Sequence, residues 1–198
     1  LYSGIIPRRA IDQFWENSFT DEAPFTKLPA LDHLSPFTME TLASAAVNAD
    51  KREWAYELIK WYWGSMVQRG LKSWPEFYNP ELDFKPENTS LCHGLGSGPS
   101  IFLINEVAGL RPAAPGLAQV YLSPLYTKLD WARCAIHTAH GYIKLEWLKN
   151  NDGGIDVTMD ANYPLEVISQ IPDEIAAVSS FHLTDNVNLL QGGPVTTT

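Results

Sequence analysis

The stretch RPAAPG, Arg111–Gly116, divides the sequence into two parts with different patterns. Its prolines and its final glycine favour a connector, because proline lacks an amide donor and glycine tolerates left-handed backbone angles. Apolar residues recur with helical spacing before this stretch, and short alternating runs follow it. We therefore expect an α+β protein, in which about four helices are followed by an antiparallel β-sandwich.

The first part carries start and stop signals for its helices. We expect helices over residues 7–18, 36–47, 51–69 and 99–108. Ser35 is a candidate N-cap with Pro36 at the first helical position, and Asp50 is a candidate cap for the third helix. Gly70 is expected just beyond the end of that helix. Residues 70–96 then form a long loop, and long loops in compact domains are often functional.

The second part is predicted to contain β-strands. Its alternating runs are AQVYLSP, LDWARCAI, GYIKLEWL, GIDVTMDA and LEVISQI. KNNDGG, residues 149–154, separates two of these runs and is typical of a hairpin turn. Because two runs joined by a tight turn pair antiparallel, we expect the strands to form antiparallel sheets.

Composition limits the classes of partner. The 198 residues carry a formal net charge of -9 and a pI near 4.9, with no cluster of Lys and Arg. Nucleic acid and anionic membrane surfaces are therefore disfavoured as partners, and no apolar run is long enough to span a bilayer. Cys92 and Cys134 have no metal-ligand spacing and are expected to be free thiols. We expect neither a metal nor a cofactor.

Two residues of the long loop are candidates for chemistry. Glu76 lies in GLKSWPEF, where aromatic neighbours, Trp74 among them, suit a sugar subsite and favour a carboxylate that acts as a general base. His93 lies in SLCHGLGSGP, where it could hydrogen-bond a hydroxylated ligand. The alternatives are a solvated loop carboxylate and a structural histidine.

Four segments carry a resemblance to a known family. They are YWGSMVQRGLKSWPEF, SLCHGLGSGPSIFL, VAGLRPAAPGLAQVYLSP and LDWARCAIHTAHGYIKLEW. In order and spacing, residues 7–148 resemble the C-terminal portion of glycoside hydrolase family 78, the α-L-rhamnosidases. The resemblance implies that residues 1–112 are the last helices of an (α/α)6 six-hairpin barrel, which four helices cannot close. It implies that residues 113–198 are a C-terminal β-sandwich domain.

The resemblance also implies roles for the loop residues. Counting from Gly70, Glu76 falls on the family's general base, and His93 falls on a histidine that contacts the sugar. Trp74 is expected to bind substrate as well. The chain departs from the family's pattern at two positions: Pro75 stands where a tryptophan precedes the base, and Leu95 stands where a tryptophan commonly follows the His-Gly pair.

The implied reaction is inverting hydrolysis of terminal L-rhamnose from glycosides or polysaccharides. No residue matches the family's general acid, so we expect this chain to depend on the missing N-terminal part of the barrel and to be inactive alone. Two alternatives remain open: another exo-acting glycosidase or a glucuronyl hydrolase on the same barrel, and a non-catalytic carbohydrate-binding or interaction protein.

Overall fold

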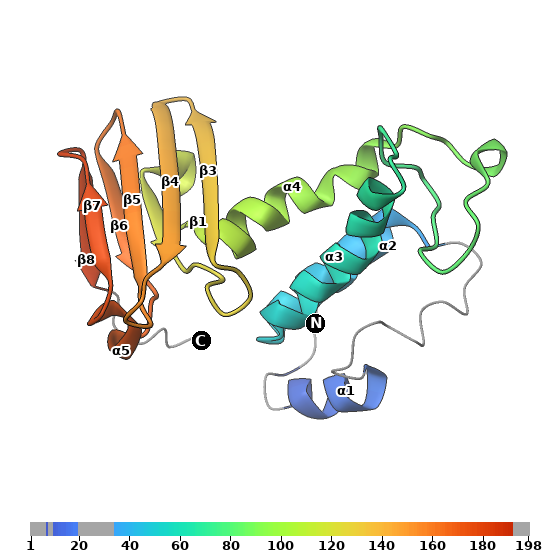
Figure 1. Cartoon of the computed structure of the whole chain (residues 1–198), viewed down its shortest axis with the longest axis horizontal. Helices are drawn as coiled ribbons and strands as arrows, with labels where there is room; N and C mark the ends of the chain where they lie inside the picture. The colour runs from blue at the N-terminus through green and yellow to red at the C-terminus, as the bar shows by residue number, and fades with distance from the viewer. Residues whose placement is uncertain (1–6, 8–9, 20–33, 192–198) are drawn as a thin grey trace. The chain divides into compact units, whose positions relative to one another are not determined.

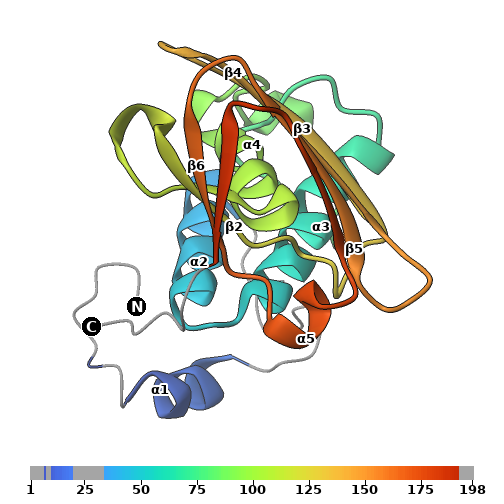
Figure 2. The ribbon, with the colours of Figure 1, turned by 90° about the vertical axis from the view of Figure 1, so that its left-hand side faces the viewer.

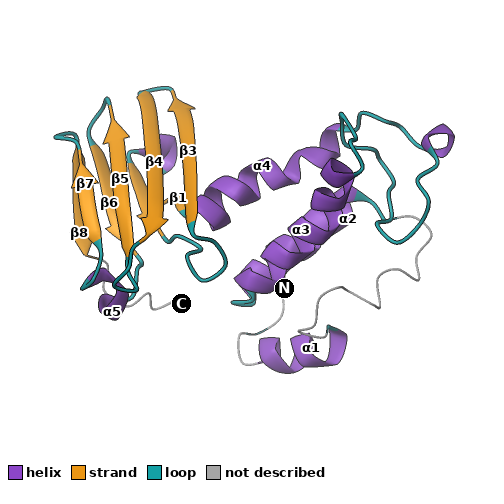
Figure 3. Ribbon diagram, in the orientation of Figure 1, coloured by secondary structure: helices purple, strands orange, loops and turns teal. Residues whose placement is uncertain are grey.

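The computed structural model describes Pro7 and residues 10–19 and 34–191 (Figure 1). The chain divides into two compact units, Leu1–Ile101 and Phe102–Thr198. Helices and loops make up the described part of the first unit, whereas strands dominate the second (Figure 3). The α+β class predicted from RPAAPG is therefore confirmed. The division into domains 1–112 and 113–198 stays a prediction.

Before the long loop, the described part of the first unit contains three α-helices: α1 (Ile11–Ser18), α2 (Pro36–Asn48) and α3 (Arg52–Gln68). Ser35 is the N-cap of α2 and Pro36 its first residue, as predicted. Gly70 has a φ of 75°, the left-handed conformation expected beyond the end of α3. Asp50 is not the cap of α3. Lys51 holds that position, because Asp50 itself lies in the tight turn between α2 and α3 with a φ of 58°.

The helices α2 and α3 pack against each other. Ala46 and Ala55 are fully buried, and alanines let two helix backbones approach closely. Buried side chains lie on several sides of α3, so neighbouring residues cover much of its circumference; the buried residues are Trp54, Leu58, Ile59, Tyr62, Trp63 and Met66. Within the predicted helix 7–18, Pro7 is not helical, and residues 8 and 9 lie outside the described part.

Residues 69–93 form the expected long loop, interrupted by one short 3-10 helix, η2 (Pro86–Asn88). The 3-10 helix η3 (Gly94–Ser97) follows and leads into α4 (Gly98–Phe102). The chain continues as a π-helix, η4 (Leu103–Ala108), which ends at Gly109 with a φ of 83°. The predicted fourth helix thus exists, but its second half has π-helical rather than α-helical hydrogen bonding.

The described part of the second unit contains two four-stranded sheets. The strands are β1 (Leu110–Pro112), β2 (Gln119–Leu122), β3 (Trp131–Thr138), β4 (Gly141–Lys149), β5 (Ile155–Ala161), β6 (Leu165–Ser169), β7 (Ser180–Leu183) and β8 (Val187–Gln191). The strand orders are β1-β2-β6-β8 and β3-β4-β5-β7. A 3-10 helix, η5 (Pro115–Leu117), and a short helix, α5 (Asp173–Ala176), lie in the connections.

The expectation of purely antiparallel sheets is wrong, because three strand pairs are parallel: β2 with β6, β5 with β7, and β6 with β8. Only adjacent runs can be paired by turn signals, and these parallel pairs join strands that are not adjacent in sequence. The KNNDGG turn does form the predicted hairpin, in which β4 pairs antiparallel with β5. Its Asn150 side chain accepts hydrogen bonds from the backbone amides of Asp152 and Gly154.

The two sheets pack face to face as a sandwich (Figure 2). Alternate residues of both sheets fill the space between them, including Leu122, Trp147, Val157 and Val167, each fully buried. The Trp147 indole donates a hydrogen bond of 3.1 Å to the carbonyl of Ala108, so η4 is tied to the same core. A buried Trp N–H without that acceptor would cost free energy.

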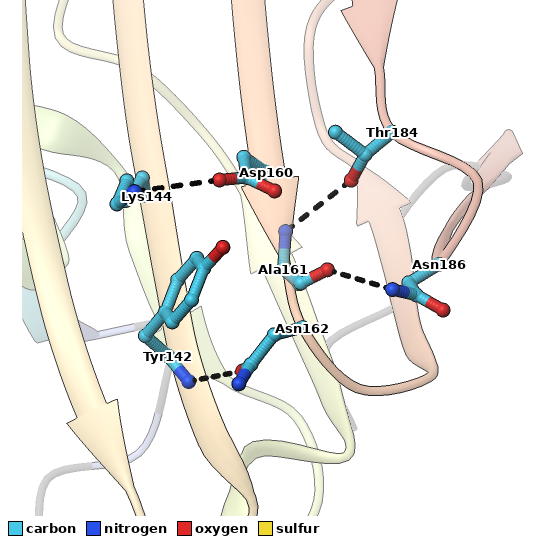
Figure 4. A network of polar contacts seen from close by, with 7 residues as sticks. All are labelled: Tyr142, Lys144, Asp160, Ala161, Asn162, Thr184 and Asn186. Atoms are coloured by element: carbon cyan, nitrogen blue, oxygen red, sulfur yellow. Dashed lines mark hydrogen bonds and ion pairs between the residues drawn. The ribbon is translucent and has the colours of Figure 1, made fainter.

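Side chains satisfy backbone groups at one end of β5 (Figure 4). Thr184 accepts a hydrogen bond from the Ala161 amide, and Asn186 donates one to the Ala161 carbonyl. The Asn162 side chain accepts from the Tyr142 amide at 2.7 Å. These bonds join β5 to β4 and to the β7–β8 connection where the backbone ladder stops, so this end of the sheet stays fixed.

Candidate functional site

The predicted site residues lie on two loop segments that run side by side, residues 73–77 and 89–93. The Glu76 amide donates a hydrogen bond of 2.8 Å to the carbonyl of Ser90, and the His93 amide donates one of 2.8 Å to the carbonyl of Trp74. Two side chains reinforce the pairing: Thr89 accepts from the Phe77 amide, and Ser73 donates to the Leu91 carbonyl. The structure thus brings Trp74, Glu76 and His93 into one neighbourhood.

Pro75 fits this pairing without loss of a hydrogen bond. The two backbone hydrogen bonds are made by the Trp74 carbonyl and the Glu76 amide. Pro75 lies between these two groups and faces two residues of the other segment. In a β-bulge, two residues of one strand lie opposite a single residue of its partner. Proline is tolerated at such a position because its backbone nitrogen does not need to donate a hydrogen bond. Proline at position 75 is therefore compatible with the observed pairing of the two segments.

Close packing fixes Trp74 next to the turn that follows His93. A Cβ atom added at Gly96 would lie 2.4 Å from the Trp74 Cβ, so only glycine leaves room there. The Gly96 amide donates to the His93 carbonyl at 2.9 Å, and its carbonyl accepts from the buried Trp63 indole at 2.9 Å. The backbone of the His93 turn is thereby joined to α3.

Tyr78, two residues after Glu76, anchors the first segment. Its amide donates to the Leu34 carbonyl at 3.0 Å, which also accepts the Tyr62 hydroxyl at 2.7 Å. The Tyr78 hydroxyl is 3.0 Å from the Ser65 hydroxyl of α3. Burial, with a smaller contribution from the neighbouring Tyr78, raises the pKa of Tyr62 far above its ordinary value, so Tyr62 remains a neutral donor at physiological pH.

Arg69 holds the part of the loop that follows Tyr78. Its guanidinium donates to the carbonyl of Pro80 at 2.7 Å and to that of Leu82 at 2.8 Å, and it lies over the Tyr78 ring at 5.4 Å. The planar fork of an arginine suits two carbonyls at once. The sequence did not predict these contacts of Arg69. In the sequence Arg69 is recognisable only as the last residue of a helix, and the loop carbonyls that it binds are far from it in the chain's pattern until the loop is folded.

Glu76 and His93 are both half-buried, as is Trp74. Within the described residues, neither the Glu76 carboxylate nor the His93 imidazole has a hydrogen-bonding or ionic side-chain partner. Such groups are available to a ligand: the carboxylate can accept a proton from water, and the imidazole can donate to or accept from a hydroxyl. Leu95, at the position where the sequence resemblance predicts a tryptophan, is 54% exposed and provides no aromatic ring.

Two hollows lie in the same unit. One has a volume of about 510 Å³ and is bordered by residues 77–79, 82–85, 88 and 89. The other, of about 360 Å³, is bordered by Leu71, Pro75 and Leu91 among others, and Phe84 borders both. Trp74, Glu76 and His93 border neither hollow. The hollows could not be predicted from sequence, since they depend on how the loop is folded back.

The described residues show neither a metal-binding cluster nor a membrane-spanning helix. Among the described residues, no three His, Cys, Asp or Glu side chains gather in a way that could hold a metal ion. None of the described helices has the length and apolar character needed to cross a membrane. Both cysteines are free thiols, as predicted.

Part of the second unit matches a known family model. Residues 109–173 match the family model of the bacterial alpha-L-rhamnosidase C-terminal domain. The chain is similar to the crystal structure of a GH78 family rhamnosidase of Bacillus sp. GL1, with a TM-score of 0.64 and 22% identity. It is also similar to native α-L-rhamnosidase from Aspergillus terreus, with a TM-score of 0.50 and 21% identity. No curated protein sequence matches the chain.

These likenesses cover most of this chain but little of the other proteins. The match covers 80% of this chain and 16% of the Bacillus protein, and 64% of this chain and 15% of the Aspergillus protein. The chain therefore spans less than a fifth of the length of these rhamnosidases. The resemblance predicted from the four sequence segments, to the C-terminal portion of α-L-rhamnosidases, is confirmed.

Proposed function

We propose that this chain is the C-terminal part of an inverting glycoside hydrolase that releases terminal L-rhamnose, since residues 109–173 match the family model of the bacterial alpha-L-rhamnosidase C-terminal domain. The observation that supports this best is the pairing of residues 73–77 with 89–93. It brings together Glu76 and His93, to which the family resemblance assigns base catalysis and sugar contact, and Trp74, whose aromatic ring suits a sugar subsite.

In this proposal Glu76 is the general base. Its carboxylate accepts a proton from water as the water oxygen attacks the anomeric carbon of rhamnose. The bond from that carbon to the leaving oxygen breaks on the opposite face, and a carboxylic acid protonates the leaving oxygen. Inverting enzymes keep their two carboxyl groups roughly 6.5–9.5 Å apart, which leaves space for the water. The acid is supplied from outside these 198 residues.

His93 and Trp74 orient the sugar in this proposal. The His93 imidazole has no side-chain partner among the described residues, so it is available to a sugar hydroxyl. Trp74 is held against Gly96 and provides an aromatic surface that suits the C–H face of a pyranose. Both residues are fixed by backbone contacts, and fixed contacts lose less entropy when a ligand binds.

Rhamnose release from an aryl α-L-rhamnoside tests the proposal. We expect none from the purified 198-residue chain, and turnover once the preceding part of the barrel is joined to it or added in trans. Turnover by the chain alone would place the acid within it. An assembled protein that cleaves an unsaturated glucuronide but no rhamnoside would replace rhamnosidase with glucuronyl hydrolase.

A further inference from the structure

The smaller of the two hollows, with a volume of about 360 Å³, lies in the first unit and is not used by the proposed function. Its volume is at the lower end of the range of roughly 300–1,000 Å³ that small-molecule sites span. Trp74, Glu76 and His93 do not border it, whereas Pro75, at which the chain departs from the family's pattern, does. The residues of its walls indicate which kind of molecule it suits.

The walls come from three parts of the unit, and hydrogen bonds hold them in place. Leu71 lies just beyond α3, where its amide donates to the Met66 carbonyl at 3.1 Å. The Ser73 hydroxyl donates to the Leu91 carbonyl, which joins the two paired segments. Pro86, the first residue of η2, provides the third side. The hollow is therefore preformed, as small-molecule sites usually are.

Rings and branched aliphatic side chains provide the apolar surface of this hollow. Pro75 is buried and Phe84 is half-buried, with the Phe84 ring 5.7 Å from the buried Tyr78 ring. Pro86 and Leu91 are exposed at the edge, Leu91 by 49%. Proline and aromatic rings pack well on one another, as in the aromatic grooves that bind proline-rich peptides. A planar aromatic ring therefore suits these walls.

Polar groups are few around the same hollow. Among the described residues that border it, only Lys72 and Ser73 are polar, and the Ser73 hydroxyl already donates to a backbone carbonyl. A sugar ring needs several polar partners for its hydroxyls, so these walls do not favour a saccharide. No carboxylate borders the hollow, so a cation is not favoured either. The exposed Lys72 ammonium offers a hydrogen-bond donor to one oxygen.

We propose that the smaller hollow binds the planar ring of a phenolic compound, with the ring between Pro75 and Phe84 and the ring's oxygen accepting a hydrogen bond from Lys72. It is a binding site and carries no chemical step. In a hydrolase that acts on glycosides, such a ring is the aglycone of an aryl glycoside; this assignment alone rests on the proposed function.

Amide NMR of the isotopically labelled 198-residue chain, titrated with phenol, tests the proposal. We expect saturable shifts centred on residues 71–73, 84 and 91. Cyclohexanol is the matched ligand, because it has the same ring size and hydroxyl without the planar ring. Aromatic pairs gain about 0.5–1.5 kcal/mol beyond the area they bury, so phenol should bind about threefold to tenfold more tightly than cyclohexanol.

Two variants with matched controls test the walls. Leu91→Ala removes apolar contact and should weaken phenol binding at least threefold, whereas Leu95→Ala, an exposed leucine that does not border the hollow, should leave it unchanged. Lys72→Met keeps most of the side-chain stem but removes the donor, and should weaken binding about threefold. Lys60→Met is its control, since Lys60 is exposed on α3 and borders no part of this hollow.

The outcomes separate this proposal from the proposed function. Glu76→Gln should leave phenol binding unchanged, and phenol binding does not depend on turnover of a rhamnoside. Absence of saturable shifts would overturn the proposal, as would equal weakening by Leu91→Ala and Leu95→Ala. Equal affinity for cyclohexanol would overturn the aromatic ligand in favour of an aliphatic one. Shifts of residues 71–73 on dilution, with no response to phenol, would show that a second copy of the chain covers the hollow instead.

Discussion

Gly96→Ala should destabilise the helical unit by distorting the turn that joins His93 to Trp74. The added Cβ would lie 2.4 Å from the Trp74 Cβ and 3.1 Å from its Cγ. Carbon atoms settle at about 3.5–4.0 Å, so one side must move by about 1 Å. The atom struck is the base of a large side chain, which cannot rotate away. Overpacking of this kind costs about 1–3 kcal/mol of the free energy of unfolding.

Gly94→Ala provides the matched control in the same 3-10 helix. A Cβ at Gly94 meets nothing within 4 Å, and the left-handed region is occupied at neither position. Both changes restrict the unfolded chain equally, so the difference between the two variants isolates the clash. With a urea m-value of about 2 kcal/mol/M, we expect the midpoint of Gly96→Ala to be about 0.5–1.5 M below that of Gly94→Ala. Equal midpoints would refute the close packing of Trp74 against Gly96.

Two further predictions concern the half-buried Cys134 and the buried Tyr62. Burial raises the pKa of the Cys134 thiol to about 11, so Cys134 should stay protonated and unreactive at pH 8, whereas Cys92 is exposed. A thiol reagent at pH 8 should therefore label one cysteine per native chain and none in Cys92→Ser; labelling of native Cys92→Ser would contradict this. Tyr62→Phe should cost about 1 kcal/mol in urea unfolding, because it removes the hydrogen bond to the Leu34 carbonyl. The cost stays small since that carbonyl keeps the Tyr78 amide, and a loss above about 3 kcal/mol would show that Tyr62 does more than donate this bond.

The sequence predicted the helix ends correctly where the residue type at the end has a fixed backbone preference. Proline at the first position of α2 and glycine beyond α3 have fixed backbone preferences, so Pro36 and Gly70 were assigned correctly. Asp50 was assigned wrongly, because an aspartate suits both an N-cap and a left-handed turn position, and the one-turn connection between α2 and α3 required the latter.

The sequence did not indicate which strands far apart in the chain pair with each other. Alternation identified the strands β2 to β6, but it carries no information on which strands become neighbours, and the parallel pairs were missed for that reason. The strands β1, β7 and β8 were not predicted at all, and Arg111 and Pro112 of β1 fall in the stretch expected to be a connector. Of the candidate site, the sequence supplied Trp74, Glu76 and His93, whereas the Arg69 contacts and the hollow beside Phe77 required the folded loop.

The most direct test of the central claim is kcat of Glu76→Gln in the complete, assembled protein, measured on an aryl α-L-rhamnoside. Loss of a general base lowers kcat by about 10²–10⁴-fold, and the isosteric amide preserves the packing of the loop. Glu87→Gln is the control, since Glu87 is exposed in η2 and borders neither hollow. The account predicts that Glu76→Gln falls by about that factor while Glu87→Gln retains parental activity. Equal, near-parental activity of both variants would show that Glu76 is an ordinary loop carboxylate.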